Sequence, residues 1–270
     1  DSSTIDFVSV TGEYGIDVTI NTAGREVIIA GTAIQGNVTN AINALINAQG
    51  GFAIQNSSII AGVKSTLSIT STPGYGAELV IIDSQFTDQN TTAGSYPYSI
   101  SGMDYIEVVN NAFKFGNRVS GVNGLSISNA KYLVFRGNEV IGYSTGLSIN
   151  NCGSAYLYNN YFVNVPNPVS YSNVSLMYAV RNIGWTPVVS TPSLPSPGAQ
   201  VTNTYPVPVT VCLYGGSVSQ VVVTKNGQSI TAFQASTPQP INGECFTLNP
   251  GDSIAITYIQ PPNWAWVPAV

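Results

Sequence analysis

The segment Asn123-Gly-Leu-Ser-Ile-Ser-Asn129 returns 22 residues later as Thr145-Gly-Leu-Ser-Ile-Asn-Asn151. The same offset continues past this segment, where it pairs Val134, Phe135 and Asn138 with Tyr156, Leu157 and Asn160. Earlier units repeat at an offset of 27 residues; the matched positions are Ile82 with Val109, Phe86 with Phe113, Tyr105 with Tyr132, and Asn111 with Asn138. A unit of 22 to 27 residues therefore recurs along the first part of the chain.

Each unit contains short alternating runs, such as Leu125-Ser-Ile127 and Tyr132-Leu-Val-Phe135, which are rich in β-branched and aromatic residues. A period of two residues that ends at Gly or Asn indicates β-strands separated by turns. Short strands that return at this spacing predict a parallel β-helix, in which each coil pairs with the coil before it. A β-sandwich with Asn-rich turns is the alternative.

One position of the unit is polar in successive repeats, and it holds Ser84, Asn111, Asn138 and Asn160. In a β-helix these four residues would stack at a turn. Asparagine tolerates left-handed backbone geometry and hydrogen-bonds its neighbours, so we expect a ladder of side-chain hydrogen bonds there.

One segment departs from the strand pattern. Residues 39–49, Thr-Asn-Ala-Ile-Asn-Ala-Leu-Ile-Asn-Ala-Gln, place Ile42, Leu45 and Ile46 on one helical face and stop at Gly50-Gly51. We expect a short amphipathic helix that caps the first coil, because an uncovered terminal coil favours association.

The run from Asn37 to Ile54 resembles the capping helix and first strand of the pectate-lyase-like right-handed parallel β-helix superfamily, which includes many phage tailspikes. The resemblance covers about residues 27–165. Asn37 and Asn40 stand where that superfamily usually has paired aspartates. The resemblance implies a short right-handed parallel β-helix over residues 1–185.

A proline-rich stretch then separates residues 1–185 from residues 199–270, which differ in their sequence pattern. Residues 186–198 contain Pro187, Pro192, Pro195 and Pro197, which favour extended backbone and exclude a helix, so we predict a linker there. Residues 199–270 carry turn signals at Asn226-Gly227 and Pro250-Gly251, which predict a compact all-β sandwich. Its cadence, which closes with Trp264-Ala-Trp266, resembles the small all-β modules that end many phage and virus structural proteins.

Composition excludes several classes of function. The chain has 270 residues, 8 basic and 13 acidic side chains, a net charge of −5 and no histidine. Eight cations do not build a nucleic-acid footprint, and without histidine there is no Ser/His/Asp triad and no His-ligated metal. We expect no cofactor, no bound metal and no membrane span. A chain with so few titrating groups changes its charge little when the pH moves, which would suit a hot, acidic environment outside the cell.

Three cysteines are present. Cys212 and Cys245 lie in predicted neighbouring strands of the C-terminal module, and we expect them to form a disulfide in a secreted chain. Cys152 lies alone in the repeat region, where we expect a buried thiol without a nucleophilic role.

Catalysis by the repeat region would depend on four carboxylates, Asp83, Asp104, Glu107 and Glu139. A glycosidase needs two carboxyl groups about 5–10 Å apart across the scissile bond. The register of the repeat places these four at different points of the coil. We therefore predict that the chain is not an enzyme and has no catalytic residues; a polysaccharide-degrading β-helix enzyme remains an alternative.

Aromatic residues are the candidates for binding or interface contacts, since such rings stack on sugars and anchor protein interfaces; they are Tyr156, Tyr158, Tyr161, Trp264 and Trp266. Packing in a core or at a domain junction is the alternative for each. Four sequons, which accept glycans only in a glycosylating compartment, begin at Asn37, Asn56, Asn90 and Asn173.

These features predict a non-catalytic extracellular structural or attachment protein, most simply a virion surface spike or fibre component that contacts the host surface. A chain that begins at Asp1 rather than Met is expected to be processed and secreted. The expected partners are further copies in a trimer or pentamer, other virion or surface structural proteins, and host surface glycans. The alternative is a cell-surface filament or surface-layer subunit, in which residues 5–20 add a strand to the next molecule.

Overall fold

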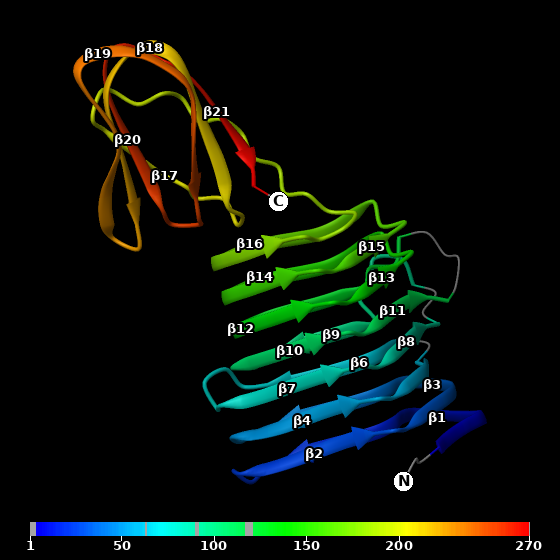
Figure 1. Ribbon diagram of the computed structural model, residues 1–270. Helices are drawn as coiled ribbons and strands as arrows, with labels where there is room; N and C mark the ends of the chain where they lie inside the picture. Colours follow the sequence, from blue (N-terminus) through cyan, green and yellow to red (C-terminus); the bar gives the residue numbers. More distant parts are fainter. Residues whose placement is uncertain (1–3, 63, 90–91, 117–120, 270) are drawn as a thin grey trace. The chain divides into compact units, whose positions relative to one another are not determined.

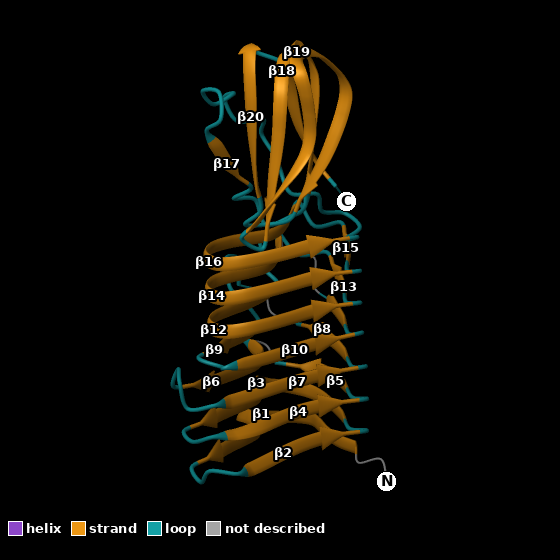
Figure 2. Ribbon diagram, turned by 60° about the vertical axis from the view of Figure 1, so that its left-hand side comes forward, coloured by secondary structure: helices purple, strands orange, loops and turns teal. Residues whose placement is uncertain are grey.

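The computed structural model describes residues 4–62, 64–89, 92–116 and 121–269. These residues are all-β, with no helix among them. The chain divides into two compact units, the first comprising Asp1–Leu176 with Arg181–Trp185, and the second Met177–Val180 with Thr186–Val270. Figures 1 and 2 show stacked strands in the first unit and long antiparallel strands in the second.

The first unit is a parallel β-helix of about six coils, which confirms the solenoid. Its first face consists of β2 (Arg25–Ala30), β4 (Gly50–Gln55), β7 (Ala77–Ile82), β10 (Tyr105–Val109) and the later parts of β12 (Leu125–Arg136) and β14 (Thr145–Tyr158). Its second face consists of the early parts of β1 (Thr4–Ile20) and β3 (Ala33–Ile46), then β5 (Ser58–Ala61), β8 (Gln85–Asp88), β11 (Ala112–Phe115), β13 (Glu139–Ile141) and β15 (Tyr161–Val163).

The third face completes each coil. It consists of the later parts of β1 and β3, then β6 (Ser65–Ser71), β9 (Tyr98–Ser101), the early parts of β12 and β14, and the part of β16 (Asn167–Val180) up to Leu176. The strands pair in the register that the repeat predicts, with Tyr105 beside Tyr132 and Val134 beside Tyr156.

Inward side chains stack coil upon coil to form the core. On the second face, Phe86 and Phe113 lie with ring centroids 5.0 Å apart and planes 7° from parallel. Tyr98 from the third face meets Phe113 edge-on at 5.2 Å, and all three side chains are fully buried. Such aromatic contacts stabilise the fold beyond the burial of the rings alone. The core is therefore built from rows of similar side chains in successive coils.

A buried polar ladder runs up the corner between the first and second faces. The backbone amides of Ser84, Asn111 and Asn138 donate to the side-chain oxygens of Asn111, Asn138 and Asn160 at 2.9, 3.0 and 3.0 Å. The ladder extends beyond the four predicted residues; its further members are Thr32, Ser57 and Asn182. The left-handed backbone lies one residue earlier, at Asp83, Asn110 and Asn159.

The predicted capping helix at 39–49 is wrong, because most of that segment lies in β3. Ile42, Ala44 and Ile46 alternate inward and are buried, whereas Leu45 is 38% exposed. The intervening Asn43 donates to Asp17 in the coil before, at 2.7 Å. The segment therefore follows the strand period of two, and the β-helix pairing outweighs the weak helical stripe.

The second unit is a separate antiparallel sheet. Its strands are β17 (Gln200–Thr202), β18 (Val209–Lys225), β19 (Gln228–Leu248), β20 (Ser253–Gln260) and β21 (Asn263–Pro268), in the order β17-β20-β18-β19 with β21 also paired to β18. The register of β18 against β19 shifts around Gly215, and Ile241, Ile254 and Trp266 pack in one core with β18.

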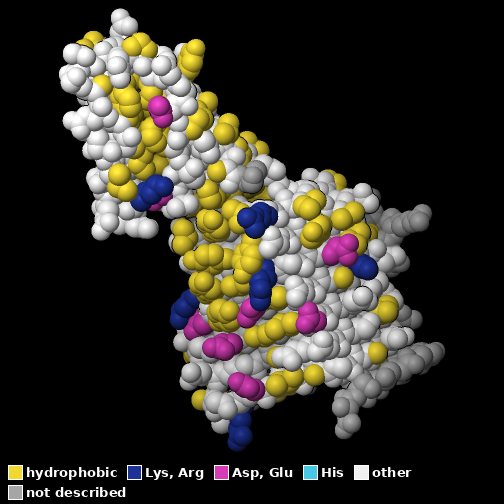
Figure 3. Space-filling model, viewed as in Figure 1, with side chains coloured by type: hydrophobic (Ala, Val, Ile, Leu, Met, Phe, Trp, Pro, Cys, Tyr) yellow, Lys and Arg dark blue, Asp and Glu magenta, His cyan; other side chains and the backbone are white. Residues whose placement is uncertain are grey.

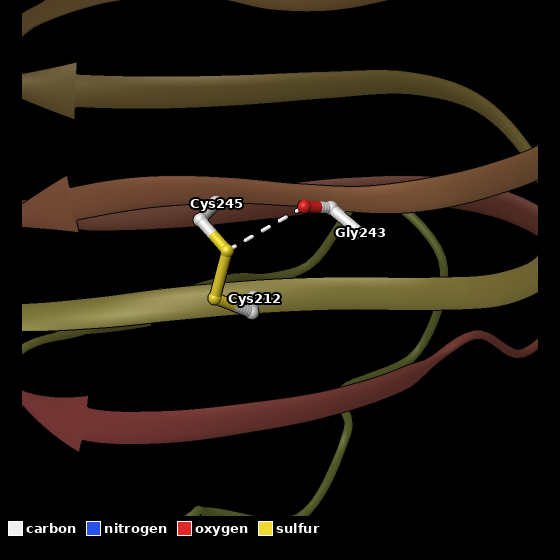
Figure 4. The surroundings of a disulfide bond; sticks show 3 residues. All are labelled: Cys212, Gly243 and Cys245. Carbon is white, nitrogen blue, oxygen red and sulfur yellow. Dashed lines mark hydrogen bonds between the residues drawn. A yellow bond between two sulfur atoms is a disulfide. The ribbon is translucent and has the colours of Figure 1, made fainter.

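The expected disulfide between Cys212 and Cys245 is present (Figure 4). The two residues lie directly opposite each other in β18 and β19, with Cα atoms 4.1 Å apart. Cys245 is exposed, so the bond lies on the outer surface of the sheet. It closes a loop with a sequence separation of 33 residues.

Replacing both Cys212 and Cys245 with serine is expected to lower the free energy of unfolding of the second unit by about 2–4 kcal/mol, because the unfolded chain regains the entropy of the open loop. Guanidinium unfolding followed by tryptophan fluorescence measures this loss. The Cys152→Ser variant, with the disulfide intact, is the matched control and should leave the second unit's transition in place. Equal midpoints for the double variant and the wild type would contradict the stabilising role.

Candidate interaction surface

The first face of the β-helix presents a row of tyrosines to the outside. Tyr105, Tyr132 and Tyr156 come from β10, β12 and β14; the ring centroids of Tyr105 and Tyr132 are 5.7 Å apart and those of Tyr132 and Tyr156 are 5.1 Å apart. Tyr132 remains 37% exposed although its ring is flanked on both sides. Strand pairing places Tyr105 beside Tyr132, whereas Tyr156 lies diagonally, two residues beyond Ser154, which is the residue paired with Tyr132.

Apolar residues occupy much of the neighbouring outward row. Strand pairing aligns Ile28, Ala53 and Val80, and then Glu107, Val134 and Tyr156. Ile28 is 57% exposed, and a hollow over Gly51 and Ala53 lies beside it. Figure 3 shows hydrophobic side chains gathered over β7, β10, β12 and β14. Exposed apolar side chains of this kind are typical of an interaction site, although Glu107 interrupts the row between Val80 and Val134.

Two ion pairs lie on this side of the β-helix, and Glu26 and Glu78, in the same outward row as Tyr105, belong to neither of them. Glu107 accepts a hydrogen bond from the Tyr105 hydroxyl at 3.2 Å and lies 3.9 Å from Arg136. Lys131 lies 3.1 Å from the carboxylate of Asp104. Burial opposes ionisation of Asp104, but hydrogen bonds from Lys131 and from the amides of the 74–76 turn outweigh it and lower the pKa of this carboxyl. The four charges of these two pairs are thus compensated within the chain.

The stacked geometry limits what the tyrosines can bind. The rings of Tyr105 and Tyr132 are 12° from parallel, so each ring covers a face of the next. A sugar stacks on a free ring face, and Tyr105 and Tyr132 each cover one face of the other, while the Tyr156 ring is tilted by 34° from that of Tyr132.

The predicted aromatic candidates do not form one site. Tyr156 and Tyr158 both lie outward on the first face, but Tyr161 belongs to β15 on the second face. Trp264 and Trp266 are in the second unit, where their rings meet edge to face at 5.5 Å. Trp266 is only 3% exposed, so it is part of the core.

The carboxylates considered for catalysis lie at separate places. Asp104 and Glu107 border or occupy β10, Asp83 is at the corner after β7, and Glu139 is in β13 on the second face. Among the residues that the structure describes, no group of three or more His, Cys, Asp or Glu side chains is arranged to hold a metal ion.

The lone thiol is shielded. Cys152 in β14 is 2% exposed, and burial raises its pKa to about 11. Its thiol donates a hydrogen bond to the Ser154 carbonyl at 3.3 Å. A thiol with so high a pKa is a weak nucleophile at neutral pH.

Two of the four sequons begin at exposed positions. Asn56 and Asn173 are exposed and adopt left-handed backbone. Asn37 is in β3, but its side chain lies outside the described atoms, and Asn90 lies outside the described residues.

Comparisons of the chain with known protein families, curated proteins and solved structures gave no match. In the described part of the chain, no helix is long and apolar enough to cross a membrane.

The sequence indicated Tyr156 and Tyr158 as candidate contact residues, but not Ile28, Ala53 and Val80, which lie on earlier coils of the same face. The row that these three residues form was readable from the period of two once the register of the earlier coils was known.

Proposed function

We propose that this chain is a non-catalytic extracellular structural protein, a virion surface spike or fibre component that assembles through the first face of its β-helix. The observation that carries the proposal is the outward row of tyrosines on β10, β12 and β14, where Tyr132 is 37% exposed, together with apolar residues on earlier coils of the same face, such as Ile28, which is 57% exposed. The chain would wind in the right-handed sense of tailspike-like β-helices, and its second unit would form a small β-sandwich.

Closed rotational symmetry is the arrangement that fits this face. Copies related by a rotation axis bury equivalent surfaces and leave no open-ended contact. A trimer or pentamer would cover the row that contains Val134 and Tyr156, with the Glu107 and Arg136 pair near the contact. Ordered tyrosines suit such contacts because their rings lose little conformational entropy on binding.

Replacing Val134 with lysine is expected to convert the oligomer into monomers at micromolar concentration, because the new ammonium group would be buried without a partner. The matched control is Ser126→Lys, in the same strand β12 but on the third face. Light scattering coupled to gel filtration measures both masses. If Val134→Lys and Ser126→Lys have the mass of the wild type, the first face is not the interface.

The virion part of the proposal has its own test. An antibody raised against the folded chain should label the surface of purified virus particles in electron microscopy. Label found only on uninfected cell surfaces would contradict a virion location.

Strand addition into a filament is the second candidate, favoured by the first coil. β1 pairs with β3 and β2 with β4, and among the described strands neither has a partner on its other edge. Residues 5–20 therefore belong to the solenoid, and a filament would form by pairing on the free edge rather than by donating this segment. Electron microscopy of concentrated protein should show fibres if this candidate is correct.

A further inference from the structure

The proline-rich segment of the second unit is bound along a row of aromatic side chains. Three ring donors reach three of its carbonyl oxygens: the Tyr205 hydroxyl donates to Ser190 at 2.7 Å, Trp264 Nε1 to Pro192 at 2.9 Å, and the Tyr258 hydroxyl to Pro195 at 2.7 Å. We call residues 190–195 the strap, and Tyr205, Tyr258 and Trp264 the aromatic groove.

The remaining contacts of the strap are backbone amides and apolar side chains. The amide of Ser190 donates to the Tyr205 hydroxyl at 3.1 Å, and the amide of Trp266 donates to the Thr191 hydroxyl at 3.0 Å. Leu194 packs against the core of the unit. The strap has no strand pairing, since residues 185–195 form no strand.

This is the chemistry by which proteins recognise extended proline-rich peptides. Proline fixes the backbone in an extended form and removes an amide donor, which leaves carbonyl oxygens as the groups to be bound. Grooves that read Pro-x-x-Pro sequences are lined by aromatic side chains. The strap contains this pattern as Pro192-Ser-Leu-Pro195, and the groove supplies a donor at each of the two prolines.

We propose that the aromatic groove is a binding site for extended Pro-x-x-Pro peptide segments of a partner protein, and that the strap is its resident occupant within the chain. The three ring donors bind main-chain carbonyls, so the groove accepts any peptide with the same backbone and an apolar side chain before the second proline. The proposal goes beyond the structural role above and does not depend on the first face of the β-helix.

The strap competes with any partner peptide for the aromatic groove. A tethered occupant competes at a millimolar effective concentration. A free peptide therefore binds well only when the strap is weakened or when the peptide is in large excess.

The test uses the full chain and a labelled synthetic peptide with the sequence of residues 186–198. The Leu194→Ser/Pro195→Ser variant weakens the strap, and Ser193→Ala, at an exposed strap position, is its matched control. In fluorescence anisotropy, the weakened variant should bind the peptide at least tenfold more tightly than the wild type or the control. Adding Tyr258→Phe and Trp264→Phe should together reduce that affinity about thirtyfold, since each change removes a hydrogen-bonding contact worth about 1 kcal/mol.

A second measurement covers the case in which the weakened variant does not fold. In the wild-type chain, a millimolar excess of the same peptide should speed hydrogen exchange at the Ser190 amide, because the displaced strap loses its bond to Tyr205. A peptide with its prolines replaced by alanine should not. Equal exchange with both peptides, or no tighter binding by a folded weakened variant, would overturn the proposal.

Discussion

Replacing Asn138 with alanine is expected to lower the free energy of unfolding of the β-helix by about 3–5 kcal/mol, because several buried polar groups lose their partners at once. The Asn138 amide oxygen accepts from the backbone and side chain of Asn111 at 3.0 and 3.1 Å. Its nitrogen donates to the Val108 carbonyl at 2.8 Å and to Asn160 at 3.2 Å. Asn138 is fully buried, so its bonding partners are shielded from solvent.

Denaturant unfolding monitored by far-ultraviolet circular dichroism measures this loss. Asn138→Ser should cost less, because Ser84 shows that a hydroxyl in the ladder accepts the amide of the coil before, at 3.1 Å. Asn150→Ala, at an exposed position that accepts a bond from Ser172, should change stability by less than about 0.5 kcal/mol. A loss at Asn138 no greater than that at Asn150 would show that the ladder does not stabilise the solenoid.

Replacing Phe113 with alanine is expected to cost about 3–5 kcal/mol, since the change removes a fully buried ring and leaves a cavity. The ring contacts Phe86, Tyr98 and Phe135, with centroid distances of 5.0, 5.2 and 6.5 Å. These partners come from all three faces, so the cavity would lie where the faces meet and could not close by a shift of one strand.

The same unfolding assay compares Phe113→Ala with Phe113→Leu. Leucine refills most of the space, and the expected loss is about 1 kcal/mol. Similar losses for the two variants would mean that the coils relax around the gap, which a rigid stack of rings does not allow.

The parallel β-helix could be predicted because the offset between repeats equals the offset between paired residues of neighbouring strands. Offsets of 27 and 22 residues place Tyr105 beside Tyr132 and Val134 beside Tyr156, as the strand pairs are. Ladder residues such as Asn111 and Asn138 marked the same corner of each coil. A repeat of side chains at fixed spacing needs no knowledge of distant contacts.

The segment at 39–49 shows that a local hydrophobic pattern does not distinguish helix from strand where pairing with neighbouring strands determines the structure. Ile42, Ala44 and Ile46 fit a strand, and Ile42, Leu45 and Ile46 fit a helix, so the sequence alone is ambiguous. The neighbouring strands resolve it, because Ile42 pairs with Ile16 on one side and Leu67 on the other.

The aromatic groove that holds the strap and the tyrosine row of the β-helix could not be predicted from the sequence. The strap was expected as a linker because proline-rich residues favour extended backbone, but the donors that hold it, Tyr205, Tyr258 and Trp264, come from other strands or loops. The tyrosine row needs the full stacking of coils before its rings become neighbours. Contacts of this kind depend on tertiary placement, which the spacing of residues does not contain.

The mass of the full chain in solution tests the central claim most directly. Light scattering at micromolar concentration, native salt and native pH should give three or five times the 28.4 kDa of one chain. A stable particle of 28.4 kDa would contradict assembly through the first face, and with it the proposal that this protein is an oligomeric surface spike.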